Sequence, residues 1–152
     1  MKTKITVLLL TIIIGLLISC NEKDDDLGVI KFTLIGQGNL YGDGQEKISK
    51  QNLTILDSNS WKELMIKMNT VNNVSDGFSE IDIDFANFIV IAVFDKVYGN
   101  GGHSIDITKI TENENEVIVS IENILKGNIT SVVTQPYHIV KIPKTNKLIF
   151  FE

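Results

Sequence analysis

Apolar and polar residues alternate over much of the chain after residue 28, which is the pattern of half-buried β-strands. Residues 29–34 place Ile30, Phe32 and Leu34 on one face and predict the first strand. The run 88–94 contains only apolar residues, so both of its alternating faces are apolar. It therefore predicts a central strand that is covered on both sides.

The C-terminal half of the chain shows shorter strand patterns separated by polar turns. The turn 112–115 joins two of these patterns into a predicted hairpin, and the odd-numbered apolar residues of its second strand are expected to face the core. The glycine-rich segment 36–44 completes no phosphate-binding motif and is predicted to be a loop. The predicted strands of this half are 104–110, 116–122, 137–142 and 148–151.

One helix is predicted, beginning near Ser60, where Ser60 and Glu63 have the spacing of a capping box. Its apolar positions recur at helical spacing, so we interpret them as core, with a ligand pocket at Trp61 as the less favoured alternative. These positions are Trp61, Leu64, Met65 and Met68. About six or seven strands and one main helix predict an α+β domain with a largely antiparallel β-sheet. A β-sandwich with a small helix is the alternative.

The N-terminal segment has the plan of a bacterial export signal. Lys2 and Lys4 precede an uncharged run over residues 5–18, which is too short to span a bilayer as a helix. The run ends in Leu-Ile-Ser-Cys, which resembles the lipobox of bacterial lipoproteins. The sequence therefore predicts a signal peptide over residues 1–19 and a lipid on Cys20, which would attach the protein to the membrane.

Residues 20–28 are predicted to form an acidic tether between the lipid and a single domain over residues 29–152. The tether resembles the surface-export signal of lipoproteins from the Bacteroidota, and a linker kept soluble by its charge is the alternative. The expected location is the bacterial cell envelope, at the outer membrane, with exposure at the cell surface if the acidic run acts as a signal.

Composition and charge narrow the class of protein further. Without Lys2 and Lys4 the mature part has 12 lysines against 19 acidic residues, a formal charge of −7, and the chain has no arginine. Nucleic acid is therefore not expected as a partner. Cys20 is the only cysteine, which excludes an internal disulfide framework, a multi-cysteine zinc site and a cysteine nucleophile in the domain.

Two groups of residues are candidates for chemistry. His103 and His138 each share a strand face with apolar residues, and they could begin a metal site or a small hydrolase site. No third ligand or nucleophile stands at a recognisable spacing, so packed or edge histidines with a satisfied ring nitrogen are favoured. Asp82 and Asp84 share a face if their segment is extended, and a solvated strand face is favoured over a weak cation site. No cofactor is expected.

The most distinctive segments are Tyr98-Gly99-Asn100-Gly101-Gly102-His103-Ser104-Ile105 and Thr134-Gln135-Pro136-Tyr137-His138-Ile139-Val140-Lys141-Ile142. A Gly-Gly turn leading into an Ile-rich strand, followed by a Pro-Tyr strand, resembles the C-terminal domain of the PrcB-like protease complex subunit family over about residues 94–144. Asn100 and His103 depart from the family pattern, which has Thr or Ser before the glycine pair and an aromatic residue after it.

The resemblance implies a non-catalytic lipoprotein that associates with and supports a surface protease or another envelope protein. It supplies no catalytic residues. The residues expected to bind the partner are Gly99, Asn100, Gly101, Gly102, His103, Pro136 and Tyr137. A module that inhibits a protease or captures a peptide through the same loop and strand is the alternative, and a hydrolase or metal protein built on His103 and His138 is a second one.

Overall fold

The computed structural model describes residues 27–152, which fold into two four-stranded β-sheets and one α-helix. The predicted signal peptide, Cys20 and most of the predicted tether lie outside the described residues. The strands are β1 (Gly28–Val29), β2 (Thr33–Leu40), β3 (Gln51–Ile55), β4 (Phe88–Phe94), β5 (Asp106–Glu112), β6 (Glu116–Glu122), β7 (Gln135–Pro143) and β8 (Leu148–Phe151). The helix α1 spans Ser58–Met68, and a short 3₁₀ turn, η1, spans Val74–Gly77.

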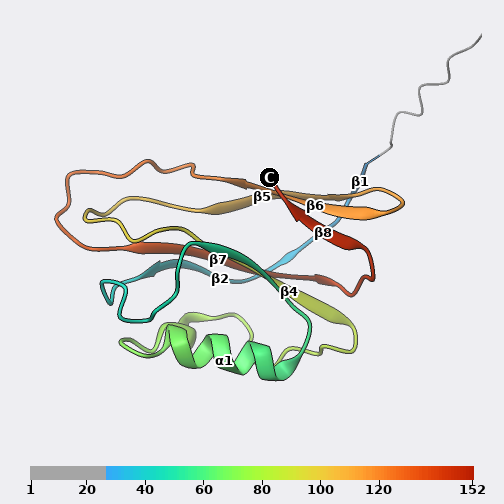
Figure 1. The fold of residues 1–152 in the computed structure, drawn as a ribbon, viewed down its shortest axis with the longest axis horizontal. Helices are drawn as coiled ribbons and strands as arrows, with labels where there is room; N and C mark the ends of the chain where they lie inside the picture. Colours follow the sequence, from blue (N-terminus) through green and yellow to red (C-terminus); the bar gives the residue numbers. More distant parts are fainter. Residues whose placement is uncertain (1–26) are drawn as a thin grey trace, which may run out of the picture.

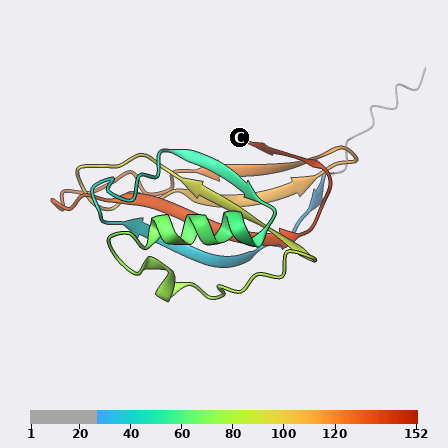
Figure 2. The same ribbon diagram turned by 60° about the horizontal axis from the view of Figure 1, so that its bottom comes forward.

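The two sheets and the helix form three layers (Figure 1). The middle sheet has the strand order β2-β7-β4-β3 and is antiparallel throughout. The outer sheet has the order β1-β5-β6-β8, with β6 and β8 parallel and the other pairs antiparallel. Figure 2 shows α1 lying across the face of the middle sheet that is turned away from the outer sheet. The fold is thus α+β with a sandwich-like pair of sheets, as expected, although it has eight strands.

Strand β4 is central, as its composition predicts. Its even-numbered residues Val90, Ala92 and Phe94 pack into the core beneath α1. Its odd-numbered residues face the outer sheet and belong to a second core. Since the middle sheet is covered on both faces, β4 needs apolar side chains at nearly every position, and each fully buried Val or Ile contributes about 1.5–3 kcal/mol to folding.

The helix buries Trp61, Leu64, Met65 and Met68, which confirms the predicted apolar stripe. Its first residue is Ser58, and the predicted capping box at Ser60 is wrong. The Asp57 carboxylate caps the helix instead, accepting hydrogen bonds from the backbone N–H groups of Asn59 (2.9 Å) and Ser60 (3.0 Å). Because Asp57 is the cap and the helix starts directly after it, Ser60 lies inside the first turn and cannot act as the cap.

The predicted strand 29–34 is wrong in one respect: it is split between the two sheets. Val29 pairs with β5 in the outer sheet, and from Thr33 onward the chain pairs with β7 in the middle sheet. Ile30 and Phe32 lie at the crossing and pack into the core between the sheets, whereas Leu34 is exposed. A strand that changes sheets buries its apolar residues on the way across, and this produces the same alternation as a single strand.

The predicted loop 36–44 is partly wrong, because Gly36 to Leu40 belong to β2. Gly36 lies under the Phe78 ring, where a Cβ atom would come within 2.5 Å of the ring carbons. Glycine at this position therefore lets the segment around η1 close over the edge of the middle sheet.

Other boundaries need small corrections. Strand β5 begins two residues later than predicted and β7 begins two residues earlier, whereas β6 and β8 have the predicted bounds.

Asp82 and Asp84 do not lie on a strand, so the premise that they share a strand face is wrong. Asp84 instead accepts hydrogen bonds from the Ala86 N–H and the Asn87 side chain. Within residues 27–152, no helix has the length and apolar character to cross a membrane.

Candidate functional site

Three connections meet at one end of the two sheets: 41–50 between β2 and β3, 95–105 between β4 and β5, and 123–134 between β6 and β7 (Figure 1, left). We call this region the loop end. It contains the predicted glycine turn and the residues just before the predicted Pro-Tyr strand. The sequence motifs singled out for partner binding are therefore close together in space.

The glycine turn is fixed by the 123–134 connection. The Gly101 N–H donates to the Thr130 carbonyl (2.9 Å), and the Gly101 carbonyl accepts from the Asn128 N–H (2.8 Å). The Asn100 side-chain amide donates to the Asn128 carbonyl at 2.7 Å. Further along, the Gly127 N–H donates to the Gly102 carbonyl at 2.9 Å. These bonds join two segments nearly 30 residues apart into one rigid unit.

The glycines of the turn have different roles. Gly102 has φ +75°, and a Cβ atom there would lie 2.5 Å from the Asn128 amide nitrogen. A Cβ at Gly101 would lie 2.9 Å from Val132 Cγ1, whereas one at Gly99 would meet nothing within 4 Å. Gly101 and Gly102 therefore shape the contact between the two connections, and Gly99 is free of any such requirement.

His103 follows the turn and stacks on Tyr98, with ring centroids 3.6 Å apart and planes 10° apart. Its Nε2 lies 3.1 Å from the Asn100 side-chain oxygen. The Lys96 ammonium group lies 5.0 Å from the centroid of the Tyr98 ring, within cation–π range. The position after the glycine pair thus holds a ring that packs against the loop itself.

Asp95 ties the loop end to the middle sheet and is almost fully buried. It accepts hydrogen bonds from the Tyr98 hydroxyl (2.7 Å), the Asn123 amide (2.7 Å) and the Lys96 N–H (2.8 Å), and Lys50 lies 3.0 Å away. Burial alone would raise the pKa of Asp95, but the Tyr98 and Lys50 contacts outweigh it and lower the pKa. Burial and the Asp95 carboxylate raise the pKa of Tyr98 to about 12. Sequence analysis missed Asp95, because one acidic residue after an apolar run carries no local signal.

A hollow of about 460 Å³ lies beside this network, between β2 and the start of β5. His103, Ser104, Asp106 and Tyr137 line it. The Ser104 hydroxyl donates to Asp106 at 2.5 Å and accepts from the Leu125 N–H at 3.0 Å. Ser104 therefore hydrogen-bonds to a carboxylate and a backbone amide, and His103 bonds to Asn100, so the hollow does not pair a hydroxyl nucleophile with an imidazole base.

His138 lies in the core between the sheets, where its Nδ1 accepts a hydrogen bond from the Ile107 N–H at 2.9 Å. The expectation of a packed histidine with a satisfied ring nitrogen is confirmed for this residue.

The remaining predicted partner-binding residues, Pro136 and Tyr137, are also buried. The Tyr137 ring packs between Phe94 and Phe78, with centroids 6.3 and 6.1 Å away. In residues 27–152, no three His, Cys, Asp or Glu side chains are arranged to hold a metal ion.

The loop end exposes four aliphatic side chains. Ile124, Leu125 and Ile129 of the 123–134 connection are 59%, 56% and 101% exposed, and Val132 is 37% exposed. Ile124 and Leu125 also line the hollow. Sequence analysis missed these four residues. The available signal was a set of aliphatic residues in a segment that has no strand or helix pattern.

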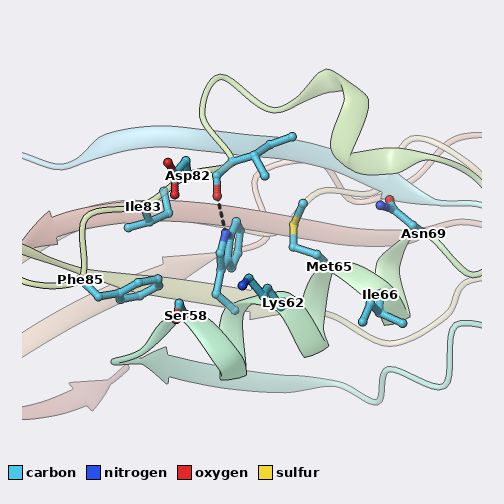
Figure 3. A pocket seen from close by; sticks show the side chains of 10 residues that line it. Ser58, Lys62, Met65, Ile66, Asn69, Asp82, Ile83 and Phe85 are labelled. Carbon is cyan, nitrogen blue, oxygen red and sulfur yellow. Dashed lines mark hydrogen bonds between the residues drawn. The ribbon is translucent and has the colours of Figure 1, made fainter.

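A second hollow lies between α1 and the segment 81–85, with a volume of about 580 Å³ (Figure 3). We call it the helix groove. Trp61, Met65, Ile66, Ile81 and Phe85 give it an apolar lining, and Lys62 and Asp82 stand at its rim. The Trp61 indole N–H donates to the Ile81 carbonyl at 2.8 Å, which joins the two walls. Trp61 is thus a core residue, as interpreted, and it also lines a pocket.

Residues 89–143 match the model of a protein family described as PrcB C-terminal. The matched segment runs from β4 to the end of β7 and includes the glycine turn and the 123–134 connection, so it supports the resemblance seen in the sequence. No curated protein and no solved structure gives a significant match to the chain.

Proposed function

Because residues 89–143 match the family model described as PrcB C-terminal, we propose that the chain is a non-catalytic subunit that binds and supports a surface protease. In this proposal, lipid on Cys20 holds the protein in the cell envelope. The family match suggests association with a protease complex. The envelope location and the non-catalytic role are our inferences from the leader sequence and from the geometry of the loop end.

The observation that carries the proposal is the exposed apolar surface of the loop end, held on a rigid support. Ile124, Leu125 and Ile129 point into solvent from a connection that backbone hydrogen bonds fix to the glycine turn. Several exposed apolar residues on one rigid element are typical of protein interfaces, because little conformational entropy is lost when a partner covers them. We therefore assign the partner interface to the 123–134 connection and the adjoining Gly99–His103 turn.

The polar groups at the same end support a binding role over a catalytic one. Ser104, Asp106 and Asp95 use their side-chain oxygens, and His103 uses its Nε2, in bonds that hold the connections together. A general base or nucleophile needs a free polar atom that reaches the substrate. The Ser104 hydroxyl and the Asp95 carboxylate instead hold the loop end together.

Co-purification tests the proposal. Tagged full-length protein would be extracted from the membrane in detergent, and the eluate would be examined by mass spectrometry and for proteolytic activity. We expect the wild type to recover a protease. The double variant Leu125→Ser/Ile129→Ser should recover at least about tenfold less of it, because the loss of side chains that anchor an interface weakens binding by about that factor. Val71→Ser is the matched control, since Val71 is 41% exposed and lies just after α1.

Equal recovery of the same protease by the double variant and the wild type would remove the loop end from the interface. The eluted chain freed of its partner should hydrolyse none of a panel of protease substrates. Activity that His103→Ala or His138→Ala abolishes in a folded protein would overturn the non-catalytic assignment in favour of the hydrolase alternative.

The helix groove favours a second candidate function, the capture of an apolar peptide. A concave apolar site with a few polar rim groups is the usual form of a peptide or small-molecule pocket. Trp61 is the only tryptophan in the chain, so selectively excited tryptophan fluorescence reports on this groove. Titration with apolar peptides should shift the emission if the groove binds them, and an unchanged spectrum at millimolar peptide would argue against this function.

A further inference from the structure

The outer face of the outer sheet carries an apolar row that crosses all four strands. The register places Val29 of β1 beside Thr111 of β5, Thr111 beside Ile118 of β6, and Ile118 beside Phe150 of β8. Their chain neighbours Ile110, Val117, Val119 and Ile149 pack into the core between the sheets, so the row faces the opposite way. Val29 and Phe150 are 68% and 48% exposed.

Leu148 extends this row into a patch. It lies two positions before Phe150 on the same face of β8 and is 68% exposed. The buried Thr111 and half-buried Ile118 fill the centre of the patch, and the large aliphatic and aromatic side chains stand at its two sides. We call Val29, Ile118, Leu148 and Phe150 the outer row. Within residues 27–152, no layer covers it (Figure 1).

The chain preceding the domain joins it at this sheet. Only seven residue steps separate Cys20 from Leu27, and a fully extended chain of that length spans at most about 25 Å. A compact domain of this size has a diameter of about 35 Å. A lipid on Cys20 would therefore keep the domain against the bilayer, with the β1 side nearest to it.

From these observations we infer that the outer row rests on the lipid surface, so that the outer sheet faces the membrane and α1 faces away from it. This inference rests on the lipid attachment in the proposed function. Glu116 and Glu122 project from the same face of β6 as Ile118, and the mature chain has a formal charge of −7. The surface that it suits is therefore zwitterionic rather than anionic.

A depth measurement on the full-length acylated protein tests this orientation. Acylation consumes the Cys20 thiol, so a single introduced cysteine can be labelled with an environment-sensitive nitrobenzoxadiazole dye. Leu148→Cys and Phe150→Cys would report on the outer row. Ile66→Cys is the matched control, because Ile66 is 71% exposed on α1 in the opposite layer. The protein would be reconstituted in phosphatidylcholine vesicles that contain nitroxide-labelled lipid.

We expect nitroxide lipid to quench the labels at 148 and 150 at least about twofold more than the label at 66, and aqueous iodide to show the reverse order. Equal quenching at all three sites in protein that stays with the vesicles would overturn the orientation while leaving the anchor intact. Protection of 148 and 150 from iodide without lipid quenching would show that a second protein copy covers the row. Protein that fails to float with the vesicles would overturn the lipid anchor and this inference together.

Discussion

The His138 ring joins the two sheets through the core: its Nδ1 accepts a hydrogen bond from the backbone N–H of Ile107 at 2.9 Å. Ile107 lies opposite Ile121 of β6, whose own N–H donates to Glu152 of the β8 side, so the Ile107 N–H points away from β6. Phe32 packs edge-on against the ring, with centroids 6.5 Å apart. A buried amide that would otherwise be unsatisfied is thus paired by a histidine from the facing sheet.

This bond predicts that acid destabilises the protein in a range where carboxylates do not titrate. Burial lowers the pKa of His138 below 6.5, against the opposing effect of Asp106. Between the two pKa values the unfolded chain binds the proton and the folded chain does not, so stability is complete above about pH 7 and falls as the pH drops below 6.5, by at most about 1.4 kcal/mol per pH unit.

Thermal melts at pH 7.5 and pH 5.5 measure this effect. In His138→Asn the amide oxygen can accept the Ile107 N–H but cannot take up a proton, so the variant should melt lower at pH 7.5 and lose less on acidification. If wild type and variant lose the same melting temperature between the two pH values, His138 is not the group responsible.

The glycine turn predicts a graded series of substitutions. Gly102→Ala should destabilise the protein by about 1–3 kcal/mol, since Gly102 has φ +75° and its added Cβ would collide with Asn128. Gly101→Ala should cost less, because only Val132 must move. Gly99→Ala should stay within about 0.5 kcal/mol of wild type. Urea unfolding of the three variants checks the order, and a Gly99→Ala loss as large as that of Gly102→Ala would contradict this account of the turn.

The hydrogen bond from the Tyr98 hydroxyl to Asp95 predicts a loss of stability when that one oxygen atom is removed. With its pKa near 12, Tyr98 stays neutral and donates to the buried Asp95 carboxylate at ordinary pH. Tyr98→Phe should therefore lower the free energy of unfolding by about 1–2 kcal/mol, while keeping the stack on His103. Tyr41→Phe is the control, because Tyr41 is 55% exposed. Similar unfolding midpoints for both variants would show that the Asp95 contact adds nothing.

The spacing of apolar residues along the sequence correctly predicted the elements whose buried positions recur at a regular interval. Strand β4 is covered on both faces and so is apolar throughout, and α1 buries one stripe against the middle sheet. The crossing at Ile30 and Phe32 was not predictable from period, because burial between two sheets and burial on one sheet give the same alternation. The parallel pairing of β6 with β8 likewise depends on where the last connection returns, which the strand residues do not encode.

The candidate site was harder to predict because its contacts join distant parts of the chain. The Gln135 amide donates to the carbonyls of Ile48 and Asp95, which lie 87 and 40 residues away along the sequence. The glycine pair correctly marked a shaped turn, but its partner, the 123–134 connection, carries no motif. Its aliphatic residues can be recognised as a candidate interface only from the fold, in which nothing in the described domain covers them.

The cap of α1 gives a direct comparison between the sequence pattern and the structure. Asp57 accepts two backbone N–H groups and the Ser60 hydroxyl, so Asp57→Ala should lower the melting temperature. Glu63→Ala should leave it unchanged, because the capping box that would need Glu63 is not the cap that forms. Circular dichroism melts separate the two, and a larger loss for Glu63→Ala than for Asp57→Ala would restore the capping box.

The lipid anchor that we propose at Cys20 can be tested directly in the cell. Cys20 lies outside the described residues, and it is the only thiol in the chain, so no other residue can carry a thioether-linked lipid in its place. In Cys20→Ala, metabolic labelling with fatty acid should disappear, and the protein should be found either soluble or with its leader uncleaved. Cys20→Ser gives the closest match in size and should behave in the same way. Label that persists in both variants would show that the fatty acid is attached elsewhere, and the leader would then be an ordinary export signal whose last residue happens to be followed by a cysteine.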